Sequence, residues 1–347
     1  MISVDMNDRK IKILEAIIHD YIKTGEPVGS RTISKKYDLG VSSATIRNEM
    51  ADLEELGYIA QPHTSAGRIP SDLGYRLYVD QLMKCPTITA DYATVIGKML
   101  QKNIGKIDEL MQETANLLAL MTNYTTLVTA PSINQTKLKH LQLVPVEDKA
   151  VALVVVTDAN IVRHNIIHTP MTIPYAIFPR LTEILNYHLQ GRTLNDINLE
   201  LVQLLKASLK EYEDIVAIII EVLLETMQED KIPDIFTSGV MNMLRFPEFK
   251  DIIKARPVFE TLEQKVLLAK LLDQTQTSGI QITIGEEHGI EQIKDCSVIT
   301  TNYKIGDYTV GAIGIIGPTR MNYAQAVSVL QYLSKHMNML LARVTEK

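Results

Sequence analysis

A polar cluster from Ser42 to Asn48 contains the side chains of this sequence that are best suited to chemistry. It precedes a run of apolar residues at helical spacing, so we expect it at the start of a helix. Arg47 can donate two hydrogen bonds to a guanine, and Asn48 can pair with an adenine or hold a phosphate. The hydroxyls of Ser43 and Thr45 suit phosphate oxygens, as do the backbone amides at a helix start. The pattern is typical of the second helix of a helix-turn-helix, which lies in the major groove of DNA.

A second polar set follows in a predicted hairpin. Residues 58–61 and 68–69 have the pattern of short strands, and residues 62–67 have the pattern of the turn between them. We expect this hairpin to form a wing, in which Arg68 touches the DNA backbone or the minor groove. The candidate DNA contacts are Ser30, Arg31, Ser42, Ser43, Thr45, Arg47, Asn48, His63, Thr64, Ser65 and Arg68.

Three predicted helices would hold these side chains in place. The first is expected to have Asp8 as its N-cap and to end at Gly25. A short second helix is joined to the third by a tight turn at residues 38–40, where glycine readily takes a positive φ. The third helix is expected to be capped by Ser42 or Ser43. Its expected buried face consists of Ile46, Met50, Leu53 and Leu56. Together with the hairpin, these helices predict a winged helix-turn-helix.

The net charge of this segment does not by itself indicate DNA binding. The first 84 residues hold 11 Lys and Arg against 12 Asp and Glu, a net charge of −1, and the whole chain has a net charge of −6. A DNA-binding surface would therefore need a local placement of charge. We expect one side to carry Lys35, Lys36, Arg47 and Arg68, and another to carry Asp52, Glu54 and Glu55. The alternative is that the helices and the hairpin form a structural or protein-binding module.

The rest of the chain changes from helical to β patterning and back. Residues 71–83 fit a strand or a helix, of which we favour the helix, and Leu and Met residues at helical spacing cover 95–124. Strands are expected at 125–130, 139–146, 150–156, 161–167, 280–285, 296–303 and 308–316, before a final helix at 323–344. The third of these strands is apolar enough to be a central strand. A mainly helical stretch at 187–276 separates the two groups of strands, which predicts an insertion into one sheet.

Composition argues against several classes of protein. An apolar content of 46% with 22% charged residues is typical of a globular protein that buries sizeable cores. The longest apolar runs, 150–156 and 215–220, are far shorter than the roughly 20 residues that span a bilayer. Cys85 and Cys296 indicate neither a disulfide framework nor a cysteine metal site. We therefore expect a cytoplasmic protein.

No catalytic, metal or cofactor site is expected from the remaining polar residues. The histidines lack metal-ligand spacing, and Gly311, Gly314 and Gly317 lie in a strand pattern that favours packing or a bulge over a dinucleotide loop. The run 286–288, Glu-Glu-His, lies between two glycines and is expected to be a solvated turn. An enzyme is therefore the least favoured class.

Motifs at both ends of the chain resemble one known family. They are Pro27–Arg31, Val41–Met50, Leu56–Tyr58, Pro62–Pro70, Ile284–Glu287 and Gly314–Met321. They resemble the signatures of the HrcA family of heat-inducible transcription repressors. The resemblance implies a homodimer that binds an inverted-repeat operator upstream of chaperone operons. It also implies that heat relieves repression and that the chaperonin GroEL keeps the repressor active.

The resemblance also implies a domain plan, within an α+β fold. A winged helix domain at 1–84 and a linker at 85–94 would precede a GAF-like antiparallel sheet domain in two parts, 95–186 and 277–347. A mainly helical dimerisation domain at 187–276 would be inserted between these parts. The alternative function is that of a metabolite-sensing transcription regulator, in which the GAF-like domain binds a small molecule that switches DNA affinity.

Overall fold

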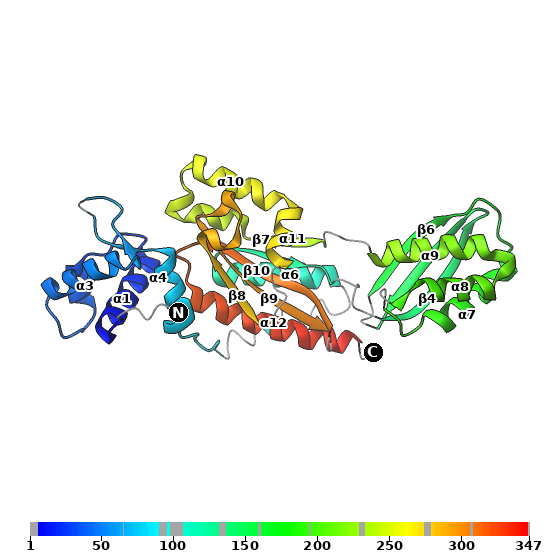
Figure 1. Ribbon diagram of the computed structural model, residues 1–347, viewed down its shortest axis with the longest axis horizontal. Helices are drawn as coiled ribbons and strands as arrows, with labels where there is room; N and C mark the ends of the chain where they lie inside the picture. The colour runs from blue at the N-terminus through cyan, green and yellow to red at the C-terminus, as the bar shows by residue number, and fades with distance from the viewer. Residues whose placement is uncertain are drawn as a thin grey trace.

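The chain folds into three bodies that lie in a row (Figure 1). The computed structural model describes residues 6–64, 66–89, 96–97, 107–131, 137–158, 161–193, 196–228, 233–273, 279–305 and 308–345. We call the bodies the N-terminal body (6–89), the central body (107–131 and 233–345) and the end lobe (137–228). Helices combine with antiparallel sheets, which confirms the expected α+β class. No helix in these described ranges is long and apolar enough to cross a membrane.

Three helices and a two-stranded hairpin build the N-terminal body. Its elements are α1 (Asp8–Thr24), α2 (Ser30–Lys36), α3 (Ser43–Glu55), β1 (Ile59–Ala60), β2 (Ile69–Pro70), α4 (Asp72–Leu77) and the π-helical turn η1 (Tyr78–Leu82). The helix expected at 71–83 is therefore confirmed. The N-cap of α1 is Asn7 and not Asp8, because the Asn7 side chain accepts the amide hydrogen of Lys10. Gly25 ends the helix at a φ of 69°, a conformation that favours glycine.

Apolar side chains of the three helices form one core in this body. They are Ile13, Leu14, Ile17, Ile18, Ile33, Ile46, Met50 and Leu53. Leu56, which we expected to join them, is 37% exposed. It lies just beyond the end of α3, and the chain turns away at Gly57 with a φ of 81°.

A five-stranded antiparallel sheet forms the middle of the central body. Its strands are β3 (Thr125–Thr129), β7 (Ile235–Ser238), β8 (Ile280–Ile284), β9 (Cys296–Ile305) and β10 (Tyr308–Pro318). Their order across the sheet is β7-β3-β10-β9-β8. One face is covered by α6 (Ile107–Thr122) and α12 (Tyr323–Thr345), and the other by α10 (Ile252–Glu263) and α11 (Lys265–Asp273) (Figure 1). The sheet is thus buried on both faces.

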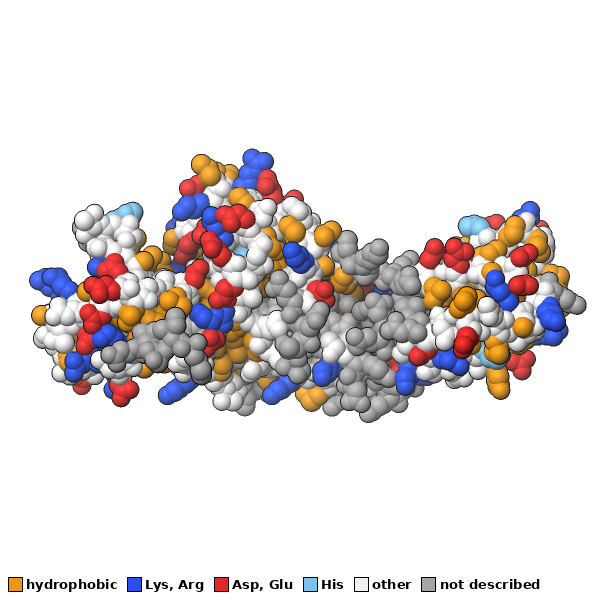
Figure 2. All heavy atoms as spheres, viewed as in Figure 1, with side chains coloured by type: hydrophobic (Ala, Val, Ile, Leu, Met, Phe, Trp, Pro, Cys, Tyr) orange, Lys and Arg blue, Asp and Glu red, His pale blue; other side chains and the backbone are white. Residues whose placement is uncertain are grey.

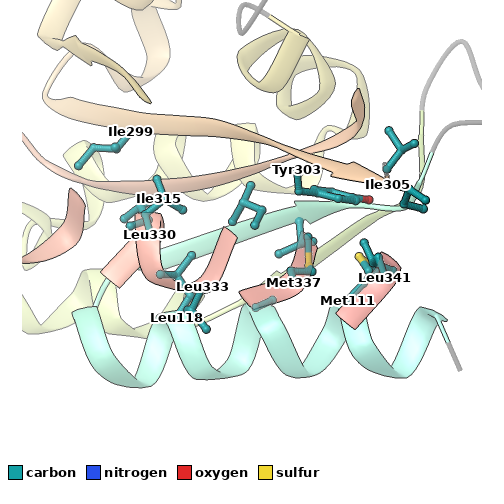
Figure 3. Close-up of a cluster of buried hydrophobic side chains, with 14 of the residues drawn as sticks. Met111, Leu118, Ile299, Tyr303, Ile305, Ile315, Leu330, Leu333, Met337 and Leu341 are labelled. Carbon is teal, nitrogen blue, oxygen red and sulfur yellow. The ribbon is translucent and has the colours of Figure 1, made fainter. Parts of the chain in front are cut away.

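Alternate side chains of β10 pack against the two helical layers. Ile313 and Ile315 belong to the cluster under α6 and α12, whereas Ala312 and Ile316 belong to the cluster under α11. Gly314 has no room for a side chain, because a Cβ there would lie 2.8 Å from Leu272. Figure 3 shows the first cluster, in which Ile299, Tyr303 and Ile315 of the sheet face Leu118, Met111, Leu330, Leu333, Met337 and Leu341. The packing role expected for this glycine is confirmed.

The end lobe has a separate three-stranded sheet. Its elements are β4 (Leu138–Glu147), β5 (Ala150–Thr157), β6 (Val162–His168), α7 (Phe178–Leu189), α8 (Leu199–Ser208) and α9 (Glu213–Gln228). As expected for so apolar a segment, β5 is the central strand. The lobe leaves the central sheet after β3 and returns before β7, where the amide of Ala130 donates to the carbonyl of Asp234 at 2.7 Å. The lobe is therefore an insertion between two neighbouring strands.

The strands divide differently from our expectation of a single interrupted sheet. We expected the segments at 139–167 to belong to the same sheet as those at 280–316, with a helical insertion at 187–276. In the described structure, the strands at 139–167 pair only with one another, and the helices after residue 250 cover the central sheet. We also did not expect β7, which is short and only half-buried. Strand pairing depends on contacts between distant parts of the chain, which local alternation does not specify.

The core under α12 gives a first testable prediction. Leu333→Ala removes a side chain with no exposed surface, so we expect a loss of about 2–5 kcal/mol in the free energy of unfolding of the central body. Leu120→Ala, at a position 71% exposed on α6, should lose well under 1 kcal/mol. Urea unfolding followed by amide hydrogen exchange in β9 and β10 measures both. Equal losses in the two variants would contradict the described packing.

Candidate nucleic-acid interface

The start of α3 is held by a serine cap. The Ser42 hydroxyl accepts the amide hydrogen of Thr45 at 3.2 Å, and the two hydroxyl oxygens lie 3.0 Å apart. Of the two serines expected as the cap, the structure selects Ser42. Ser43 and Thr45 are half-buried, whereas Arg47 and Asn48 are exposed. The cap leaves the first turn of α3 open to a ligand at its exposed side.

The exposed direction of Arg47 follows from the buried face of α3. Ile46, Met50 and Leu53 are at most 5% exposed and anchor the helix on α1. Arg47 lies next to Ile46 in the chain, and a helix turns about 100° per residue, so its side chain faces solvent. No acidic side chain of the described residues pairs with it.

Two basic residues of α1 pair with two of the acidic residues of α3. Glu49, only 9% exposed, lies 3.3 Å from the guanidinium of Arg9 and 3.1 Å from the ammonium of Lys10. Lys10 also lies 2.9 Å from Asp52. Hydrogen bonds to Asp52 and Glu49 raise the pKa of Lys10 above its ordinary value. These pairs reduce the negative potential that α3 would otherwise present to a polyanion. We did not predict them, because a charge count does not reveal partners.

Arg68 forms an ion pair with Glu54. Its Nε donates to the Glu54 carboxylate at 2.9 Å, and a terminal nitrogen lies 2.7 Å from the same oxygen. Our expectation that these two charges lie on different sides is therefore wrong. The backbone of Arg68 pairs with Val28, with hydrogen bonds of 2.8 and 2.9 Å, and this bridge sets the side chain beside α3.

The tip of the hairpin presents two of the expected contacts to solvent. His63 and Thr64 are exposed, and Ser65 lies outside the described residues. The side-chain amide of Gln61 donates to the carbonyls of Thr64 and Ala66 at 3.0 and 3.1 Å. These bonds brace the turn from within.

The two candidates on α2 lie at its first turn. Ser30 is half-buried and Arg31 is exposed. Lys36, at the other end of this helix, lies 2.6 Å from Asp20 of α1. This ion pair offsets the positive charge that Lys36 would otherwise offer to DNA. Figure 2 shows acidic and basic side chains interspersed over this end of the molecule in the view drawn. The candidate surface therefore depends on a few exposed bases and not on a uniform basic patch.

The run 286–288 is a turn whose two glutamates are exposed, as expected, but its histidine is buried, which we did not expect. Glu287 binds Arg76 of α4, and His288 is 2% exposed. The His288 Nδ1 accepts from the amide of Ile290, which makes Nε2 the protonated nitrogen that donates to the carbonyl of Ile293 at 3.0 Å. Burial lowers the pKa of this imidazole below its ordinary value. The segment is a packed joint between bodies.

A hollow of about 570 Å³ bears on the alternative of a small-molecule sensor. It lies where the segment after η1 passes α6 and α12. Its apolar lining includes Pro86, Ile88, Leu117, Leu120, Met121 and Val329, and its polar lining consists of Thr87, Thr89, Asn123, Gln325 and Ser328. No charged side chain is among the described residues that line it. Within the described ranges, no cluster of three His, Cys, Asp or Glu side chains could hold a metal ion.

Comparison with known proteins relates the chain to one family. The family model "HrcA protein C terminal domain" matches residues 108–327. The heat-inducible transcription repressor HrcA of Lachnoclostridium phytofermentans is 45% identical over 334 residues, covering 95% of this chain and 96% of that protein. The protein of the same name from Ruminiclostridium cellulolyticum is 42% identical, covering 96% and 97%.

A solved structure resembles the whole chain. It is a crystal structure described as that of a hypothetical protein, with a TM-score of 0.61 and 25% sequence identity. The match covers 98% of this chain and 100% of that chain. The overall fold is thus shared with an experimentally determined structure.

The serine cap gives a second testable prediction. Ser42→Ala leaves the Thr45 amide without its partner, so we expect a loss of about 1 kcal/mol in the stability of the first turn of α3. Amide hydrogen exchange at residues 44–46 should accelerate accordingly. Ser34→Ala, at an exposed position in the middle of α2, is the matched control and should leave these rates unchanged. Unchanged exchange in Ser42→Ala would show that the cap does not hold the helix start.

Proposed function

Because the chain belongs to the HrcA family of heat-inducible transcription repressors, we propose that it represses transcription by binding an inverted-repeat operator as a homodimer. The observation that carries the DNA-binding part is the serine-capped start of α3. There, Arg47 and Asn48 are exposed while the opposite face of the helix is buried. An exposed arginine and asparagine in the first turns of such a helix are suited to base edges.

In this proposal the N-terminal body is a winged helix-turn-helix. Helices α2 and α3 with the turn at Gly40, whose φ is 65°, form the helix-turn-helix, and the hairpin of β1 and β2 forms the wing. Arg47 and Asn48 read bases. Phosphate contacts come from Ser30, Arg31, Ser42, Ser43, Thr45, His63, Thr64, Ser65 and Arg68. Arg68 contacts a phosphate either while its guanidinium also stays paired with Glu54 or after that ion pair breaks.

The central body is GAF-like in this proposal. When its strands are numbered along the chain without the end lobe, their order across the sheet is 2-1-5-4-3, with helices on both faces. The family resemblance associates such a sheet domain with an inserted dimerisation domain. The insertion between β3 and β7 supports that plan, with the end lobe in the inserted position.

The outer face of the end-lobe sheet is our candidate dimer surface. The register aligns Val144, Ala152 and Ile166 in one row across β4, β5 and β6. Val144 and Ile166 are 42% and 52% exposed. Two further apolar side chains of β4 and β6, Val146 and Val162, are exposed to a similar extent. An open apolar sheet face suits a self-complementary two-fold contact between two copies. A two-fold dimer matches the symmetry of an inverted repeat.

Exposed apolar side chains on the central body support the proposed control by the chaperonin GroEL. Ile252 and Ile253, at the start of α10, are both 79% exposed, and Met241 nearby in the turn η5 (Val240–Arg245) is 69% exposed. Such side chains are the kind of surface that a chaperone for apolar segments can hold. In our proposal the chaperonin keeps the repressor active, and heat relieves repression when unfolded proteins compete for the chaperonin.

The proposed function is tested by the loss of one arginine. Arg47→Ala should weaken binding to the inverted repeat by about 1–3 kcal/mol and relax the preference for one base pair in each half-site. Gel shifts with the operator region of a chaperone operon, at fixed salt concentration, measure both. Arg256→Ala is the matched control, because this arginine is exposed on α10 and pairs with Glu260 in the same helix. Unchanged affinity and base preference in Arg47→Ala would refute the role of α3.

The dimer surface is tested separately. Ile166→Arg places a charge in the proposed contact, so light scattering should give the mass of a monomer at micromolar concentration, and affinity for the inverted repeat should fall. Ile252→Arg makes the same change at a more exposed isoleucine on the central body and should remain dimeric. A dimeric Ile166→Arg variant would contradict our assignment of the surface.

A further inference from the structure

Two arginines join the N-terminal body to the central body. Arg320, in the turn between β10 and α12, contacts the end of α1. Arg76, in α4, contacts the turn η7 (Gly285–His288) after β8. Neither residue is among the proposed DNA contacts, and both connect segments that are far apart in the chain.

The Arg320 guanidinium lies at the C-terminus of α1. It donates to the carbonyl of Ile22 at 3.3 Å, which is one of the last carbonyls of that helix and has no partner within it. Its charge also interacts favourably with the negative end of the helix dipole. A Cβ added at Gly25 would lie 3.2 Å from the guanidinium carbon, so the backbone at the end of α1 packs against the Arg320 side chain.

The surroundings of Arg320 make its position specific. Its side chain is only 9% exposed, and both carboxylate oxygens of Glu248 accept from it. The ring of Phe246 lies 5.4 Å from the guanidinium carbon. Glu248 and Phe246 belong to the central body, as Arg320 does, so they hold the guanidinium in one place there, from which it reaches the carbonyl of Ile22 in the N-terminal body.

At the contact between α4 and the turn η7, the Arg76 guanidinium forms a bidentate pair with Glu287. Nε and a terminal nitrogen donate to the two oxygens of Glu287, and that terminal nitrogen also donates to the carbonyl of Ile282 at 2.7 Å. Glu287 is itself oriented, since one of its oxygens accepts from the amide of Ile284 at 2.8 Å. A bidentate pair restricts direction as well as distance.

The two contacts belong to one continuous junction. Tyr75, next to Arg76, and Tyr323, the first residue of α12, place their rings 5.8 Å apart, and both are at most 2% exposed. Gly285 allows α4 to approach, because a Cβ there would collide with the carboxylate of Asp72. The junction therefore fixes α4 and α1 against the central body at several points.

We propose that Arg76 and Arg320 are positioning residues that fix the direction of α3 relative to the end lobe, and thereby set the half-site spacing that the dimer accepts. This inference rests on the proposed function. The N-terminal body and the end lobe lie at opposite ends of the molecule (Figure 1), so a swivel at the junction displaces α3 from its half-site. When one copy of the dimer is bound, a rigid junction gives the α3 of the other copy a high effective concentration at a half-site of one particular spacing. A loose junction distributes that effective concentration over many spacings.

The first experiment measures spacing preference. Full-length protein is titrated with a single half-site and with inverted repeats whose spacer grows by one base pair at a time. The variants are Arg76→Gln, the double variant Arg76→Gln/Arg320→Gln, and the control Arg256→Gln, which removes an exposed arginine–glutamate pair within α10. We expect wild type and control to show one sharp optimum.

The junction variants should respond in a distinct way. We expect their affinity for the single half-site to stay within about two-fold of wild type, and their affinity at the optimum to fall about ten-fold, with other spacings bound nearly as well. Arg76→Gln, whose side chain lies at the rim, should show the smaller change and covers the case in which the double variant does not fold. An unchanged spacing profile overturns the proposal. An equal loss on the single half-site also overturns it, because the DNA-reading body itself would then be damaged.

The second experiment needs no DNA. Spin labels at Ser34→Cys on α2 and Lys335→Cys on α12, both exposed positions, report the distance between the two bodies in a Cys85→Ser background diluted with unlabelled protein. Wild type and Arg256→Gln should give a narrow distance distribution, and the junction variants a broad one. A narrow distribution in the junction variants overturns the inference while leaving the proposed function intact. Failure of wild type to bind any inverted repeat would instead contradict the proposed function.

Discussion

Arg320 carries a full positive charge into a junction where only 9% of its side chain reaches solvent. Removing a charge from water costs several kcal/mol unless partners replace the lost hydration. Here Glu248, the ring of Phe246 and the carbonyl of Ile22 do so, and they come from both bodies. Glu248 and Phe246 fix the guanidinium within the central body, and its bond to the carbonyl of Ile22 joins the N-terminal body to it. The Arg76 contact and the ring pair of Tyr75 and Tyr323 then extend the same interface.

The central sheet lies between the proposed DNA-binding surface and the proposed dimer surface. Because helices cover both of its faces, the sheet itself has no open side for a partner. The end lobe emerges between β3 and β7, at the edge away from β8, whereas α4 meets the turn after β8. The proposed DNA contacts and the proposed dimer contacts therefore lie at opposite ends of one scaffold (Figure 1). Such a separation makes the stiffness of the scaffold matter for recognition of a two-part operator.

Local pairing offsets part of the negative charge beside the candidate DNA surface. The N-terminal body has almost no net charge, yet Glu49 and Asp52 of α3 are held by Arg9 and Lys10 of α1. Arg47 is left exposed beside them. This arrangement gives a modest attraction for DNA in general and leaves discrimination to a few contacts with bases.

Local signals in the sequence determined the elements that depend on neighbouring residues. The stop of α1 at Gly25, the cap of α3 at one of two neighbouring serines and the apolar run of β5 could all be predicted, because caps, turns and burial patterns involve residues close in the chain. The same holds for Arg47, whose exposure follows from the buried stripe on the opposite face of its helix.

Only the tertiary structure decided which distant segments meet. It placed β4, β5 and β6 in a separate sheet, paired Arg68 with Glu54, and buried His288, each against our expectation. The Arg320 contact with the end of α1 has no local sequence signal, since Ile22 is 298 residues away in the chain. Strand alternation and charge counts describe a residue's own segment, whereas pairing and burial of charge are set by whichever segment the fold brings opposite.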